Sequence, residues 1–172
     1  MQISSRFTIA VHIFTCIAIA EKKFKVTSKF LAGSINVNPV IIRNIVLMLK
    51  AKGLINSRQG SSGISIAKCP TEITLLDIFN AVESLDNGQL FSFHENPAKD
   101  CPVGRNIHVA LDHHLVAIQK AMEDKLASIT IDSIIKEAEA AISKETDADI
   151  NNELDTDINN ESDAGTNKDR EA

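Results

Sequence analysis

A chain of 172 residues suits one compact domain with a small appendage, and its three widely spaced cysteines favour a reducing cytoplasm over a disulfide framework. No apolar run approaches the ~20 residues that span a bilayer, and the MQISSRF start lacks a signal-peptide pattern, so we expect no membrane partner. The formal net charge of −5, taken as an average, argues against nucleic acid as a partner.

The first part of the chain predicts two helices. Ser4 or Ser5 caps a helix that ends near residue 21, because apolar residues recur there at intervals of three and four. Thr27 or Ser28 then caps a second, shorter helix. A short basic link joins the two helices.

A third helix and a hairpin follow. Asn38 is a preferred N-cap and Pro39 suits the first helical position, while Gly53 ends the helix. The polar run RQGSSG, residues 58–63, separates two short strands and predicts a β-hairpin. Three helices with a basic hairpin predict a winged helix-turn-helix, in which the third helix enters a major groove and the hairpin reaches a neighbouring groove or phosphate.

The second part of the chain predicts a long helix with an apolar stripe. A helix over about residues 73–82, capped by Thr74, precedes a polar connection and the helix from about Val103 to Ser128, and a last helix fits residues 130–142. A stripe of this length needs a partner. A second copy is favoured because two-fold dimers read operator half-sites, and packing on its own domain is the alternative. The stripe consists of Ile107, Leu111, Leu115, Ile118, Met122 and Leu126.

The charge is divided unevenly. Residues 1–68 carry ten Lys and Arg against one acid, Glu21, for a net of +9, whereas residues 69–143 and 144–172 each carry a net of −7. We therefore predict a winged helix-turn-helix DNA-binding domain over 1–85, a connecting loop with dimerisation helices over 86–143, and an acidic disordered tail over 144–172. A repeat in the tail departs from a calcium loop at two required positions, Asn160 and Thr166.

Four stretches, MQISSRFTIAVHIF, NPVIIRNIVLMLKAKGLI, RQGSSGISIA and ITLLDIFNAVE, together resemble the Rrf-type family of bacterial winged-helix transcriptional regulators. The family includes IscR, NsrR and CymR, and the stretch CPVGRNI is similar to its YwnA-like branch, which lacks an iron–sulfur cluster. The resemblance covers about residues 1–142. It implies a homodimeric repressor that binds double-stranded DNA at a palindromic operator.

The resemblance also implies which residues contact DNA. Base contacts fall on Asn38, Val40, Arg43 and Asn44, and Arg and Asn have the donors and acceptors that read guanine and adenine. For each polar residue a helix cap or a solvated surface is the alternative, and Asn38 can be both cap and contact. The other expected contacts, to phosphate and in the wing, are Ser4, Ser5, Arg6, Thr27, Ser28, Lys50, Arg58, Gln59, Gly60 and Gly63.

The cysteines differ from those of the family's cluster-binding members, which carry three closely spaced cysteines where this chain has only Cys101. We therefore predict no iron–sulfur cluster, no other cofactor and no metal. A zinc site made by His94, Cys101 and His108 would match no standard spacing. Cys101 precedes the long helix, where a helix N-terminus stabilises a thiolate, and is a candidate redox sensor. The alternative is a helix-entry residue that only packs.

The sequence thus predicts a mainly α fold with a small β-hairpin and a sequence-specific DNA-binding regulator, modulated by thiol oxidation or a small ligand. No glycine-rich phosphate loop, nucleophile–base pair or metal motif indicates an enzyme. The alternative function is a winged-helix module that binds only protein. Its basic half would then serve an acidic partner, such as the chain's own tail.

Overall fold

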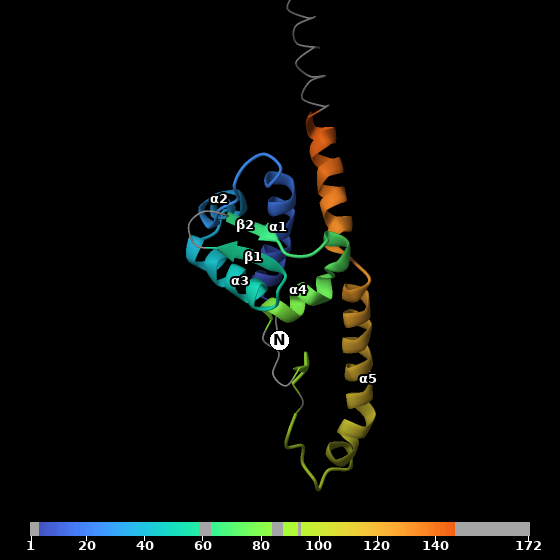
Figure 1. Ribbon diagram of the computed structural model, residues 1–172. Helices are drawn as coiled ribbons and strands as arrows, with labels where there is room; N and C mark the ends of the chain where they lie inside the picture. Colours follow the sequence, from blue (N-terminus) through green and yellow to red (C-terminus); the bar gives the residue numbers. More distant parts are fainter. Residues whose placement is uncertain (1–3, 59–62, 84–87, 93, 147–172) are drawn as a thin grey trace, which may run out of the picture. The chain divides into compact units, whose positions relative to one another are not determined.

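The computed structural model describes residues 4–58, 63–83, 88–92 and 94–146. The chain divides into two units, residues 1–135 and 136–172. The first unit contains every element labelled in Figure 1, and in the second unit residues 136–146 are helical. The described part is mainly α with one two-stranded antiparallel hairpin, which confirms the predicted fold class. Most of the predicted acidic tail, 147–172, lies outside the described residues.

The first three helices begin at predicted caps. The side chains of Ser4, Thr27 and Asn38 each accept a hydrogen bond from a backbone N–H two or three residues further on. Gly53, with φ of 67°, follows the third helix and turns the chain into the hairpin. The helices are α1 (Ser5–Ala20), α2 (Ser28–Ile35) and α3 (Pro39–Ala51).

The hairpin pairs β1 (Ile55–Arg58) with β2 (Gly63–Ile66) in antiparallel register. The first strand lies one residue later than predicted and the second strand one residue earlier. The reason is that the ladder extends toward the loop and pairs Arg58 with Gly63. These two residues therefore end the strands and do not belong to the loop. The other predicted wing residues, Gln59 and Gly60, lie outside the described residues.

Gly63 connects the hairpin to the segment before α2. Its φ is 75°, and a Cβ at this position would lie 2.8 Å from the Val26 carbonyl oxygen. We expect Gly63→Ala to cost more free energy of unfolding than the ~1–2 kcal/mol of a left-handed backbone alone. Gly53→Ala is the matched control, because φ is also positive there and nothing lies within 4 Å. Chemical denaturation measures both variants, and equal losses would contradict the close approach.

The core lies among α1, α2, α3 and α4 (Leu75–Val82). A capping box begins α4, in which Thr74 Oγ1 accepts from the Asp77 N–H and the Asp77 carboxylate accepts from the Thr74 N–H. A short 3₁₀ turn, η1 (Pro70–Glu72), precedes it and was not predicted. The largest fully buried side chains are Phe14, Phe79, Ile13, Ile17, Leu31, Ile42, Ile45, Leu49, Ile55, Ile73, Ile78 and Ile131.

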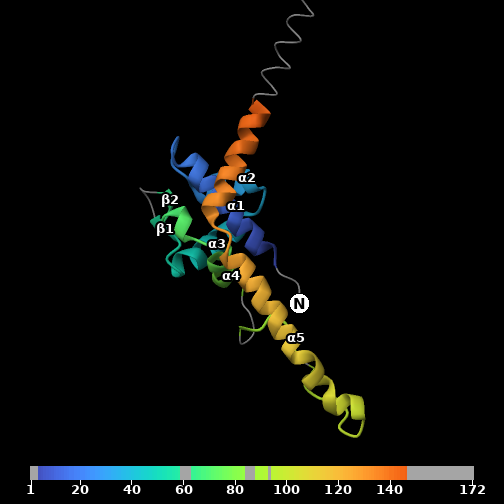
Figure 2. The ribbon, with the colours of Figure 1, turned by 90° about the vertical axis from the view of Figure 1, so that its right-hand side faces the viewer.

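The predicted long helix is α5 (Pro102–Ala127), and none of its side chains is fully buried. Figures 1 and 2 show its C-terminal end beside α4 and its N-terminal end directed away from α1–α3. After α5 the chain returns to the start of α4, where the Ile131 N–H donates to the Ile73 carbonyl at 2.8 Å. Both isoleucines are fully buried. The end of α5 is therefore fixed to the start of α4.

No single described helix is long and apolar enough to cross a membrane. The helices α2 and α3 meet the length and composition criteria only as a pair bent by 115°.

Candidate nucleic-acid interface

One face of α3 is exposed and carries the predicted base contacts. Arg43 and Asn44 lie on it beside two apolar side chains, Val40, which is 54% exposed, and Leu47, which is 62% exposed. These four residues span about a quarter of the helix circumference at 3.6 residues per turn. The sequence did not predict Leu47, because it lies within an almost continuous apolar run in which only burial separates the two faces. The buried face consists of Ile42, Ile45, Val46 and Leu49.

Asn38 stands at the N-terminal end of this face and caps α3. Its Oδ1 atom accepts from the Val40 N–H at 2.8 Å. The cap uses only the oxygen, so the Nδ2 amide stays able to donate to a base or a phosphate. Asn38 can therefore fill both of its predicted roles.

The start of α1 lies opposite α3 across a cavity of about 330 Å³. The cavity brings together two predicted contacts from distant parts of the sequence, Arg6 of α1 and Asn44 of α3. The rest of its lining is mostly apolar. The lining consists of Ser5, Arg6, Ile9, Ile41, Asn44, Ile45 and Met48.

The Ser4 side chain, a predicted phosphate contact, bonds to a carboxylate of the protein itself. Its hydroxyl donates to Glu83 Oε1 at 2.6 Å, in addition to accepting from the backbone of α1. This carboxylate lies near the N-terminus of α1, where the helix dipole favours an anion. A phosphate at Ser4 would have to compete with Glu83 for the same place.

Lys50 lies near the other end of α3 from Asn38. Its ammonium group donates to the Ser57 carbonyl at 2.7 Å and ties α3 to β1. A phosphate contact at Lys50 would share this group with the hairpin.

At the start of α2, Thr27 accepts from the Phe30 N–H at 3.2 Å. Its neighbour Ser28 is half-buried.

The predicted stripe of α5 divides into two sets. Ile107, Leu111 and Ile118 point outward and are 37%, 43% and 54% exposed. Leu115, Met122 and Leu126 are half-buried. The outward set lies within about 40° around the helix axis, and the second set continues around one side of it. The outward set therefore forms an apolar band along α5 that the described part of the chain leaves exposed, and we call it the outward band.

The connection before α5 is fixed to the helix by polar contacts. The Gln119 side chain accepts from the Leu90 N–H at 2.9 Å and donates to the Gly88 carbonyl at 2.8 Å. Nearby, Lys120 Nζ lies 2.6 Å from Asp124 Oδ1, and this hydrogen bond raises the pKa of Lys120 above its ordinary value. These contacts leave the outward apolar band uncovered.

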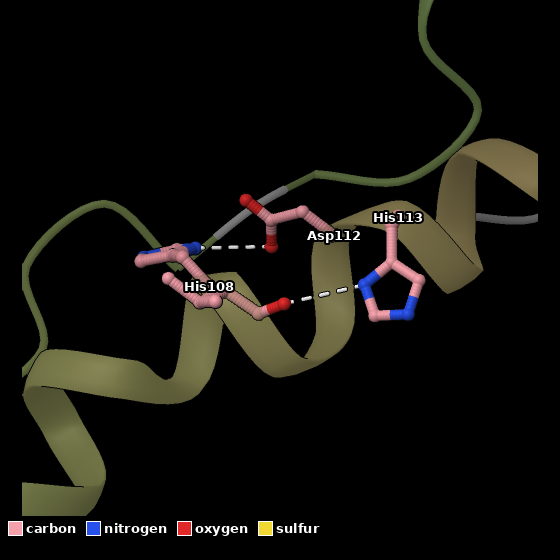
Figure 3. A network of polar contacts seen from close by, with 4 residues as sticks. His108, Asp112 and His113 are labelled. Atoms are coloured by element: carbon pink, nitrogen blue, oxygen red, sulfur yellow. Dashed lines mark hydrogen bonds and ion pairs between the residues drawn. The ribbon is translucent and has the colours of Figure 1, made fainter.

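Two histidines of α5 make contacts along their own helix (Figure 3). His108 Nδ1 lies 3.1 Å from Asp112 Oδ1, and His113 Nδ1 lies 3.2 Å from the Val109 carbonyl oxygen. Among the described residues, no group of three or more His, Cys, Asp or Glu can hold a metal ion. The structure therefore does not bring His94, Cys101 and His108 together as a zinc site.

The three cysteines are free thiols on separate elements. Cys16 Sγ, on α1, lies 3.3 Å from Ser34 Oγ, and Cys69 accepts from Thr71 Oγ1 at 3.0 Å. Cys101 is exposed and stands at the N-cap of α5, as the sequence predicted.

Comparison with known proteins gives consistent matches. Residues 3–137 match the Rrf2 family, described as iron-dependent transcriptional regulators. YwnA of Bacillus subtilis (strain 168), provisionally assigned as an HTH-type transcriptional regulator, is 39% identical over 134 residues, or 78% of this chain and 97% of YwnA. A solved structure provisionally assigned as a DNA-binding protein is 36% identical, with a TM-score of 0.61 over 76% of this chain and 99% of its own.

A second solved structure, T. potens IscR, is 22% identical, with a TM-score of 0.56 over 82% of this chain and 90% of its own, and supports the fold alone. Iron–sulfur ligation needs about four ligands, mostly thiolates, whereas the described thiols lie on three separate elements. The described residues of this chain do not fit a cluster. The family match and the identity to YwnA show that the chain belongs to the Rrf2 family of DNA-binding transcriptional regulators and is not an enzyme.

Proposed function

We propose that the protein is a cytoplasmic, sequence-specific repressor that binds a palindromic operator as a homodimer and holds no iron–sulfur cluster. The observation that carries the proposal is the exposed face of α3, where Arg43 and Asn44 lie beside Val40 and Leu47. Arg and Asn read guanine and adenine in the major groove, and apolar side chains contact the thymine methyl group. Repression, as opposed to activation, follows the family resemblance.

The surrounding groups are assigned to the DNA backbone. Arg6 lines the same cavity as Asn44, so Arg6 is assigned to a phosphate near the base that Asn44 reads. Lysine and arginine contacts to phosphate fix the register of α3 but carry no sequence information. The wing, from Arg58 to Gly63, is assigned to the neighbouring groove or phosphate.

A second copy of this chain is the partner assigned to the outward band of α5. The band covers residues 107–118 of a 26-residue helix that has no buried side chain. Exposed apolar surface of this extent marks an interaction site. A two-fold dimer through α5 would present two α3 helices, which is the arrangement that reads a palindrome.

Selection of bound sites from a random duplex pool tests the function, with binding repeated over a range of salt. We expect a palindrome and an affinity that falls steeply as salt rises, by about 0.9 in logarithmic slope for each neutralised phosphate. Binding that ignores sequence would contradict a specific regulator. Failure to bind any duplex, together with binding to an acidic protein, would favour the alternative of a protein-interaction module.

Thiol oxidation is the proposed signal, and Cys101 is the proposed sensor. The thiol is exposed at the N-cap of the helix that carries the outward band. Peroxide would convert it to a sulfenic acid with release of water, adding a polar group at the helix entry. A small ligand is the alternative signal, and the cavity between α1 and α3 has the size for one.

We expect Cys101→Ser to bind the selected site like the parent but to lose the response to hydrogen peroxide. Cys69→Ser, at another exposed cysteine, is the matched control and should keep the response. DNA-binding titrations before and after peroxide treatment measure the effect. An unchanged response in Cys101→Ser would end the sensor proposal.

A further inference from the structure

A basic surface lies on the turn between α1 and α2 and the start of α2, apart from the α3 residues assigned to base reading. Lys22, Lys23 and Lys25 of this turn, with Lys29 at the start of α2, place four positive charges within eight residues, and all four are exposed. We call these four residues the lysine turn. Its acidic neighbour in sequence is Glu21, so the turn and Glu21 together keep a net charge of +3.

The lysine turn is joined to the base of the wing. The Ile64 N–H of β2 donates at 3.0 Å to the carbonyl of Val26, the residue after Lys25. A Cβ at Gly63 would lie 3.0 Å from Lys25 Cγ, so the stem of Lys25 lies against the first residue of β2. The lysine turn and the start of β2 therefore adjoin each other.

The turn also has a defined conformation. The N–H groups of Lys23 and Phe24 both donate to the Ala20 carbonyl, at 2.9 and 3.0 Å. The Phe24 ring packs edge-on against Phe30 of α2, with ring centroids 4.9 Å apart, although Phe24 is 49% exposed. This half-exposed aromatic pair fixes the turn to α2 and so sets where the lysines stand.

We propose that the lysine turn binds phosphates of duplex DNA that flank the base pairs read by α3. The proposal rests on the proposed function for its position, but the contact itself is independent of sequence. An ammonium group on a flexible stem binds phosphate as a point charge and does not read bases. A chain with a net charge of −5 has to concentrate its positive potential locally to approach DNA, and the lysine turn does so beside the wing.

The test is the salt dependence of binding to a long duplex of scrambled sequence. The variant Lys22→Gln/Lys23→Gln/Lys29→Gln spares Lys25, whose stem supports the hairpin. If each replaced lysine contacts one phosphate, a dimer loses six contacts, and the slope of log K against log salt becomes shallower by about 5. Lys99→Gln/Lys120→Gln/Lys125→Gln removes the same charge from α5 and its approach, and should leave the slope close to that of the parent.

Two further measurements keep the proposal testable if the triple variant folds poorly. Glu21→Gln should steepen the slope and tighten binding to the same scrambled duplex, because it removes the acid beside the turn. Adding flanks of about one helical turn, ~10 base pairs, to each end of the selected site should tighten binding by the parent but not by the triple variant. Thermal melting compares the folding of all variants.

The outcomes separate this proposal from the proposed function. An unchanged slope in the triple variant, or an equal change in the control, would overturn the role of the lysine turn. Loss of binding to phosphatidylserine vesicles with an unaltered DNA slope would overturn it in favour of a lipid surface. A lysine-dependent slope on scrambled duplex without any selected palindrome would support the lysine turn and contradict the specific regulator. A parent that binds no duplex would overturn both.

Discussion

Glutamate at two positions of the outward band, Leu111→Glu with Ile118→Glu, is expected to convert the dimer to monomers and to weaken operator binding by about 100-fold or more. An unpaired carboxylate buried in an apolar interface costs several kcal/mol. The double variant would place two such groups on each protomer. A monomer then holds one half-site and loses the second set of contacts.

The physical basis is the division of the α5 stripe. Leu115 and Met122 are half-buried, whereas Leu111 and Ile118 remain 43% and 54% exposed. Glutamate at the outward positions therefore leaves the packing of the half-buried side chains intact. The expected loss is one of association, and the free energy of unfolding of the winged domain should change little.

The opposite side of α5 provides the matched control. Val109 and Val116 are also apolar, with 78% and 62% exposure, and lie about 180° around the helix from the outward band. Val109→Glu with Val116→Glu makes the same chemical change and should leave both the dimer and operator binding intact. Sedimentation velocity measures the oligomeric state and fluorescence anisotropy measures DNA affinity. If the Leu111→Glu/Ile118→Glu variant stays dimeric, or the Val109→Glu/Val116→Glu control becomes monomeric, the outward band is not the dimer interface.

Features that depend on a few neighbouring residues could be predicted from the sequence. The caps at Ser4, Thr27 and Asn38 each involve one side chain and an N–H two or three residues further on, so the signal is contained in a short segment. The hairpin was also predicted, although its strand ends were one residue out, because the extent of a ladder depends on the pairing of both strands.

Features that depend on distant residues could not be predicted. The hydrogen bond from Ser4 to Glu83 joins residues near the two ends of the winged domain's sequence. The cavity lined by Arg6 and Asn44 exists only once α1 packs near α3. Periodicity showed that one side of α5 is apolar. It could not show that part of that side is half-buried while another part faces outward, since this depends on where the connecting segment and α4 lie.

Arg43→Ala is expected to relax the preference for one base pair in each half-site by about 1–3 kcal/mol. Arg43 lies on the exposed face of α3, where its fork of donors matches the O6 and N7 acceptors of guanine. The measurement compares parent and variant on the selected site and on the same site with each base pair replaced in turn. The parent should discriminate at one symmetric pair of positions where the variant does not.

A phosphate contact would give a different pattern, and Lys50→Ala is the comparison. Loss of a lysine that contacts phosphate weakens binding to every duplex alike and makes the salt slope shallower by about 0.9 for each lost contact. Lys50 also holds β1 through the Ser57 carbonyl, so its variant is checked for folding before DNA is added. Arg43→Ala could instead weaken binding to every duplex equally and keep the base preference. In that case Arg43 contacts the DNA backbone, and Asn44 with the exposed apolar residues beside it reads the bases.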